Sequence, residues 1–291
     1  MHAVSGCFPH LTRRGFLIAG GMALSALRAF PSDPACTLTS EQEEGPYYVD
    51  DETIRRDITE GKPGVPLVLA VRLVDSRTCA PLRNAALDIW HCDATGVYSG
   101  FTASSPDGRG MPPGGDGRMP PGPPGHGDGP PPPGFGPGGP RARQIDSTRF
   151  LRGVQLSDER GAVEFSTLYP GWYFGRAIHI HAKVHLGGAA EKKYSGGHVA
   201  HTGQFYFPED VTERVAKIQP YAKRLEVHRT SQKEDGIFNS QHGATGMLQM
   251  ERLGRTDEDG FRASVTLAVD PEASPAPVRG FGGRGPGPSA L

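Results

Sequence analysis

Short segments in which apolar and polar residues alternate recur along this chain, and they constrain its fold more than any other feature. The segment 261–269 places Phe261, Ala263, Val265, Leu267 and Val269 on one face, because successive side chains of a strand point to opposite sides. Further strands are predicted at residues 65–75, 85–90, 150–156, 162–167 and 204–207. Many short strands separated by turns indicate an all-β protein, and we expect a β-sandwich with Greek-key connections.

The segments between these strands are short and rich in turn residues. Residues 76–84 hold a proline and several polar residues, which predicts a hairpin-like connection between the first two strands. Residues 157–161 are predicted to form a turn between the strands at 150–156 and 162–167. Val211, Val215 and Ile218 have helical spacing, so a short amphipathic helix is predicted there. The fold class is therefore all-β with few short helices.

Residues 106–140 have a different composition from the rest of the chain. Of these 35 residues, 13 are glycine and 13 are proline. Such a segment has little apolar surface to bury, so nothing offsets the entropy lost on ordering. We interpret it as a long disordered loop insertion and the Gly/Pro-rich end, 271–291, as a disordered tail. One folded domain, 31–270, is left.

The first 30 residues are predicted to be an export signal. Arg13 and Arg14 precede an apolar run, Phe16 to Leu27, that is too short for a membrane span of about 20 residues. The pattern favours a twin-arginine signal over a buried helix and predicts a periplasmic or extracellular protein with no stable membrane span. The net charge of −1 gives no indication of a nucleic-acid partner.

Three cysteines follow the predicted signal, in which Cys7 lies. An oxidising compartment permits disulfides, and Cys79 and Cys92, which flank a predicted strand, could pair. This pairing leaves Cys36 as an odd thiol. The sequence has no Cys-x-x-Cys, which argues against a zinc–thiolate site.

A predicted strand carries His179 and His181 with one residue between them, so both imidazoles project from the same face. Neutral imidazole is a common metal ligand. His185 shares that face but lies about 13 Å further along, too far to bind the same ion. Tyr173 stands just before the strand at a Pro-Gly turn. A phenol with a pKa near 10 binds at neutral pH only to a strongly positive cation such as Fe³⁺. A zinc hydrolase site built on the histidines is the alternative.

Three blocks resemble the intradiol ring-cleavage dioxygenases, the family of the catechol and protocatechuate dioxygenases. They are EGPYYV at 44–49, DIWHCDATGVYSG at 88–100 and TLYPGWYFGRAIHIH at 167–181. The resemblance implies that Fe³⁺ is bound by Tyr98, Tyr173, His179 and His181. It also implies intradiol cleavage of a catechol-type aromatic by O₂, an oxidoreductase reaction of aromatic catabolism that gives a cis,cis-muconate-type product.

The resemblance assigns further residues to the substrate. Arg176 matches an arginine that lies against the bound ring, so it is expected to be catalytic together with Tyr173. Gln204, in the segment GQFYF, is a weaker candidate for lining the same pocket. Tyr48 and His91 are further candidates for substrate binding, with packing roles as the alternative.

The chain also departs from the family pattern. The Gly/Pro insertion, the export signal and His91, where glutamine is commoner, suggest an exported branch. Neither the particular catechol nor the oligomeric state, a homodimer included, follows from the sequence. A transthyretin-like binding module and an inactive iron-binding homologue are the rival hypotheses, because a fold does not fix a function.

Overall fold

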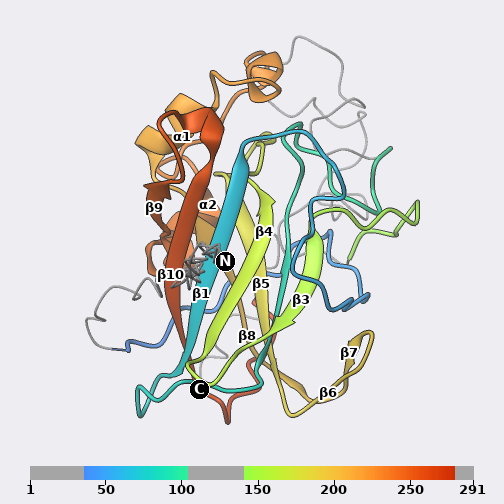
Figure 1. The fold of residues 1–291 in the computed structure, drawn as a ribbon, viewed down its shortest axis with the longest axis vertical. Helices are drawn as coiled ribbons and strands as arrows, with labels where there is room; N and C mark the ends of the chain where they lie inside the picture. The colour runs from blue at the N-terminus through green and yellow to red at the C-terminus, as the bar shows by residue number, and fades with distance from the viewer. Residues whose placement is uncertain (1–35, 104–140, 279–291) are drawn as a thin grey trace, which may run out of the picture. The chain divides into compact units, whose positions relative to one another are not determined.

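The computed structural model describes residues 36–103 and 141–278 (Figure 1). The predicted signal, residues 1–30, and the predicted disordered insertion, 106–140, lie outside these ranges, as does most of the predicted tail. The described part of that tail, 271–278, contains neither helix nor strand. Within the described ranges, no helix has the length and apolar character that crossing a membrane requires.

Two four-stranded sheets and one small hairpin contain the strands of the described residues. The first sheet has the order β4 (Ala162–Leu168), β1 (Pro66–Asp75), β10 (Phe261–Val269), β9 (Gln249–Arg252). The second has the order β3 (Arg152–Leu156), β2 (Ala86–Trp90), β5 (His179–Leu186), β8 (His198–Tyr206). The hairpin pairs β6 (Ala189–Ala190) with β7 (Tyr194–Ser195).

Helices are few and short, as predicted. The α-helices are α1 (Glu209–Val215) and α2 (Gly236–Ser240), and the 3₁₀ turns are η1 (Tyr221–Arg224), η2 (Gly243–Gly246) and η3 (Asp257–Asp259). The side chain of Asp235 caps α2 by accepting hydrogen bonds from the backbone N–H groups of Ile237 and Phe238. The described fold is therefore mostly sheet, which confirms the all-β prediction at that level.

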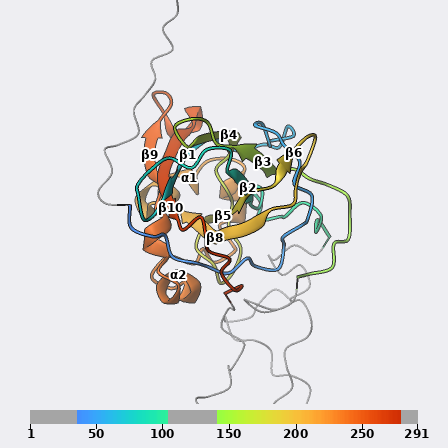
Figure 2. The same cartoon turned by 90° about the horizontal axis from the view of Figure 1, so that it is seen from below.

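Both large sheets contribute side chains to one apolar core. In the first sheet, β1 runs parallel to β10 with Leu67 opposite Phe261, so the apolar faces of the two strands coincide. From the second sheet, Ile180 and Val184 of β5 join the same buried cluster. Figure 2 shows the strands of the two sheets as separate layers. Because Ile180 faces the core, the neighbouring residues of β5 face the opposite side, where the candidate site lies.

The predicted hairpin-like connection between the first two strands is wrong. β1 and β2 belong to different sheets, and the same is true of β3 and β4, which flank the turn at residues 157–161. Turn residues indicate that the chain reverses direction, but they do not indicate whether the flanking strands pair with each other. Leu69 and Leu87 approach the shared core from different sheets, so each connection passes from one layer to the other.

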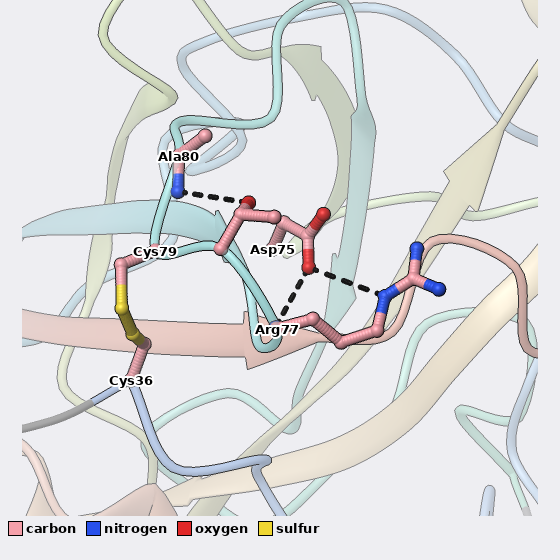
Figure 3. Close-up of a disulfide and its surroundings, with 6 residues drawn as sticks. Cys36, Asp75, Arg77, Cys79 and Ala80 are labelled. Atoms are coloured by element: carbon pink, nitrogen blue, oxygen red, sulfur yellow. Dashed lines mark hydrogen bonds and ion pairs between the residues drawn. A yellow bond between two sulfur atoms is a disulfide. The ribbon is translucent and has the colours of Figure 1, made fainter.

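The predicted Cys79–Cys92 disulfide is also wrong, because the bond joins Cys36 to Cys79 (Figure 3). Cys79 lies in the turn that follows β1, where its backbone N–H donates to Asp75 O. Cys92 follows the opposite end of β2 and is buried as a free thiol. The predicted strand between Cys79 and Cys92 is real, and its extended length separates the two cysteines, which lie beyond opposite ends of β2.

We expect the Cys36→Ser substitution to lower the free energy of unfolding by about 4 kcal/mol. The bond closes a loop with a sequence separation of 43 residues, and chain-entropy estimates for a loop of that length give roughly this value. Urea unfolding of oxidised wild-type and variant protein measures the difference. Dithiothreitol should lower the stability of the wild type to that of the variant and leave the variant unchanged. Equal stabilities under oxidising conditions contradict the prediction.

Candidate metal centre

His179 and His181 lie on the outer face of β5 and are both buried. The Nδ1–H of His179 donates to the backbone oxygen of Ala177 at 2.6 Å, which leaves a lone pair on Nε2. That atom lies 3.1 Å from Nε2 of His181. Burial, together with the charge of Arg176, lowers the pKa of His179 to about 3. Burial also holds the pKa of His181 well below its usual range. Both imidazoles are therefore neutral at pH 7, the form that binds metals.

Two phenol oxygens complete the group. Tyr173 Oη lies 3.2 Å from Nε2 of His179, and Tyr98 Oη lies 3.4 Å from Tyr173 Oη. Burial raises the pKa of each phenol above its usual value of 10. A cation that binds these oxygens as phenolates has to overcome that cost, which favours a high positive charge. The structure thus brings together all four residues that the sequence analysis selected as ligands.

Aromatic rings and the chain itself enclose these four side chains. The ring of Trp90 stacks on His181 with centroids 4.9 Å apart, and Tyr47 stacks on Tyr98 at 4.7 Å. The backbone at Gly45 passes directly over His181, because a Cβ at that position would lie 3.0 Å from Cε1 of the imidazole. Gly45 also has a φ of +73°, which favours glycine. Residues 44–48 therefore cover the site.

Arg176 is held beside the candidate ligands by four side chains. Its Nε donates to both carboxylate oxygens of Asp235 at 3.2 and 3.1 Å, and its Nη1 donates to Glu43 at 3.3 Å. Its Nη2 donates to Gln204 Oε1 at 2.6 Å and to Tyr206 Oη at 3.3 Å. The prediction that Arg176 and Gln204 lie together at the site therefore agrees with their positions.

Two buried carboxylates in this network were not predicted from the sequence. Asp235 is 0% exposed and Glu43 is 1% exposed. Although burial opposes the charge of Arg176, the neighbouring Tyr206, Asp235, Tyr173 and Glu43 raise its pKa, so the guanidinium stays protonated. Burial raises the pKa of Glu43 despite the attraction of Arg176. Glu43 directly precedes the EGPYYV block, which was the one local signal for it.

The other two predicted substrate-binding residues have internal partners. Tyr48 Oη donates to Asp88 at 3.0 Å, and it is the neighbouring Tyr47 whose ring lies on Tyr98. His91 is 0% exposed; its Nδ1–H donates to the backbone oxygen of Cys92 at 2.8 Å, and its Nε2 accepts from Thr167 Oγ1 at 2.8 Å. The geometry therefore favours structural roles for Tyr48 and His91.

His91 gives a testable pH dependence. Burial lowers its pKa from 6.5 to about 4. The unfolded chain therefore binds this proton more readily, so stability is retained above pH 6.5 and lost as the pH falls toward 4. We expect the loss to reach about 3 kcal/mol from this group. Urea unfolding between pH 7 and pH 4 measures how the free energy of unfolding changes with pH. This slope should be smaller for His91→Gln than for the wild type. The exposed-site variant His228→Gln should keep the wild-type slope, and an equal slope for His91→Gln contradicts the assignment.

The chain segments on either side of residues 104–140 are hydrogen-bonded to one another. The backbone N–H of Ile145 donates to Gly100 O at 2.8 Å, and that of Thr102 donates to Asp146 Oδ2 at 2.9 Å. Arg141 pairs with Glu44 at 2.5 Å, within the segment that covers His181. Residues 100–103 and 141–146 thus meet beside the candidate site.

Comparison with known proteins shows what this chain is similar to. Residues 43–110 match the family model described as Dioxygenase_C: Dioxygenase. An intradiol ring-cleavage dioxygenase from Tetranychus urticae is 30% identical with a TM-score of 0.63, and the match covers 82% of this chain and 98% of that one. A second dioxygenase crystal structure matches with 30% identity, a TM-score of 0.62 and the same coverage. Among curated proteins, none matches the chain.

A more distant structure is the dioxygenase domain of a carbohydrate-binding fusion protein from the cellulolytic bacterium Streptomyces sp. SirexAA-E. It is 22% identical with a TM-score of 0.47, and the match covers 80% of this chain and 98% of that domain. The first two structures are the ones that show family membership, because each is 30% identical to this chain and is covered over 98% of its length.

Proposed function

Because the chain belongs to the intradiol ring-cleavage dioxygenases, we propose that it cleaves a catechol-type aromatic between its two hydroxylated carbons. Both atoms of O₂ enter the product, which is of the cis,cis-muconate type. The observation that carries this proposal is the approach of two buried imidazole nitrogens and two phenol oxygens, each 3.1 to 3.4 Å from the next.

The donor set fits a ferric ion, which we propose as the cofactor held by Tyr98, Tyr173, His179 and His181. Two phenolates and two neutral imidazoles leave Fe³⁺ with a single positive charge, which one hydroxide cancels. The tautomer of His179 is already fixed for binding by its bond to Ala177. When bound, the ferric ion supplies the Lewis acidity that makes the substrate hydroxyls lose their protons.

The phenol groups are proposed to differ in role. Tyr173 stands on the turn after Pro170-Gly171 and is the less enclosed of the two, so its Oη accepts a proton from a substrate hydroxyl. Tyr98 is 0% exposed and lies between Tyr47 and Tyr173, so it keeps its position throughout. The charged guanidinium of Arg176, fixed by Asp235 and Gln204, stabilises negative charge that develops on the ring.

Two further features are proposed with this function. The Arg13-Arg14 segment directs export to the periplasm or the outside of the cell, which Edman sequencing of the secreted chain tests through the loss of the first residues. The two sheets form a Greek-key sandwich, supported by the core they share.

Colour and product mass test the proposed function. The purified protein should contain about one iron per chain and be red-brown, because tyrosinate-to-ferric charge transfer absorbs visible light. With catechol, substituted catechols and hydroxyquinol, oxygen uptake should accompany a product heavier than the substrate by two oxygen atoms. A colourless protein that contains zinc contradicts the cofactor. A coloured protein that consumes no oxygen with any catechol contradicts the activity and leaves an inactive iron-binding protein.

A further inference from the structure

The outer face of β5 continues beyond the candidate iron ligands to a second group of polar side chains. Lys183 and His185 follow His181 on this face, and Asp88 of β2 pairs with Lys183. Glu52 reaches the same place from the segment before β1. One oxygen of Glu52, one oxygen of Asp88 and one nitrogen of His185 all lie within 4.8 Å of one another. None of these three residues belongs to the site of Tyr98 and Tyr173.

His185 has a ring nitrogen without a hydrogen-bond partner in this group. Its side chain is 8% exposed, and Nε2 has no such partner among residues 36–103 and 141–278. The nearest carboxylate oxygen, on Glu52, is 4.0 Å away, which is too long for a hydrogen bond. Burial and the charge of Lys183 lower the pKa of His185 to about 4, so the imidazole is neutral. A buried polar atom without a partner is costly, which indicates that something else binds there.

The two carboxylates have fewer donors than they can use. Tyr48 Oη carries one proton, but it lies 3.0 Å from Asp88 Oδ2 and 3.3 Å from Glu52 Oε1, so it serves one of them at a time. The ammonium of Lys183 is bound to Glu44 and lies 3.6 Å over the ring of Tyr48. Asp88 is only 5% exposed, and burial raises its pKa to about 7. Oxygens of both carboxylates therefore remain available to a cation.

We propose that Glu52, Asp88 and His185 form a second metal site that binds a divalent transition-metal cation such as Zn²⁺. One imidazole nitrogen and two carboxylate oxygens suit such an ion, and they leave positions open for water. Ligand atoms at about 2.0–2.2 Å from zinc lie closer together than 4.8 Å, so small side-chain rotations close the site. Tyr48 Oη, which lies 3.0 Å from Asp88 and 3.3 Å from Glu52, contacts the cation or its water.

The cation ties the segment that contains Glu52 to β2 and β5. That segment is otherwise joined to the hairpin β6–β7 through the pairing of Thr53 with Lys193. Because the three ligands come together only in the folded chain, a metal that binds them raises thermal stability.

Zinc titration of the iron-loaded protein tests the proposal. Calorimetry and elemental analysis should give one Zn²⁺ per chain in addition to the iron, with the visible iron absorption unchanged, and the melting temperature should rise. Asp88→Asn and His185→Gln should each weaken zinc binding by at least about tenfold. The control His228→Gln, a histidine whose side chain is 58% exposed, should bind zinc as the wild type does.

Several outcomes overturn the proposal. One is the absence of zinc beyond the iron, and another is zinc binding that Asp88→Asn and His185→Gln leave undiminished. If either variant fails to fold, Glu52→Gln replaces it, because that side chain is 21% exposed and at the edge of the group. A zinc-induced rise in melting temperature that persists in Glu52→Gln also rejects the site. Iron content and oxygen uptake are recorded in parallel, so these results are independent of the dioxygenase proposal.

Discussion

The Tyr173→Phe variant is expected to keep its iron and to lose at least about 100-fold in kcat, the usual effect of removing a group that transfers a proton. Phenylalanine fits the same space but offers no oxygen to accept the substrate proton. Without Tyr173 Oη, the Nε2 atoms of His179 and His181 still lie 3.1 Å apart, and the rings of Tyr98 and His181 still have centroids 6.3 Å apart, so three donors remain near one another. Iron analysis, the visible spectrum and steady-state oxygen uptake measure the two effects separately.

Tyr98→Phe is the matched comparison. Tyr98 is enclosed by Tyr47 and Tyr173 and is proposed to stay bound throughout, so its loss should deplete the protein of most of its iron and of its colour. Both variants remove one phenol oxygen from the same site. A difference between them therefore shows that the two tyrosines have different roles. If Tyr98→Phe keeps iron and Tyr173→Phe loses it, the two assignments are reversed.

Asp235→Asn is expected to cost about 3–5 kcal/mol of stability and at least tenfold in kcat/KM. The substitution removes the charge of the carboxylate that accepts from Nε of the buried Arg176 guanidinium, and breaking a buried pair on one side has a cost of this size. Asparagine keeps only one of the two acceptor oxygens, so either the backbone N–H of Ala177, which donates to Oδ2, or the start of α2, which donates to Oδ1, also loses its acceptor. A guanidinium that shifts by about 1 Å stabilises ring charge poorly, which accounts for the kinetic effect.

Urea unfolding and oxygen-uptake kinetics measure both losses, and a surface pair supplies the control. Asp210 binds Arg214 on α1 with its side chain 74% exposed, so Asp210→Asn should change neither quantity measurably. Arg176→Lys separates charge from geometry, because lysine keeps the charge but cannot make the forked contacts. Wild-type kcat/KM in Asp235→Asn rules out a positioning role for this carboxylate.

Local sequence patterns predicted most of the strands, for a physical reason. Alternation along β10 and β5 follows directly from strand geometry, so Phe261 and Val269 could be placed on one face of β10, and His179 and His181 on the face of β5 opposite Ile180. The tyrosines came from blocks resembling a known family, and the structure places Tyr98 and Tyr173 beside the histidines.

Features that depend on which distant segments meet could not be predicted in this way. Asp235 reads as part of an Asp-Gly turn, and only the fold places it against Arg176, 59 residues earlier. The same limit explains the error over Cys79, since no local pattern brings residue 36 to the turn after β1. Sheet membership of β1 and β2 likewise depends on the shared core and not on the turn between them.

Residues 100–103 are hydrogen-bonded to residues 141–146, so the geometry of the candidate site does not depend on the length of the chain between them. The entropy of closing a loop grows only with the logarithm of its length, so doubling it costs about 0.6 kcal/mol. Once Thr102 is bonded to Asp146, and Arg141 to Glu44, the catalytic face is fixed whatever lies in between. An engineered chain with a shorter or longer stretch between these two anchor points should therefore keep the arrangement of the site.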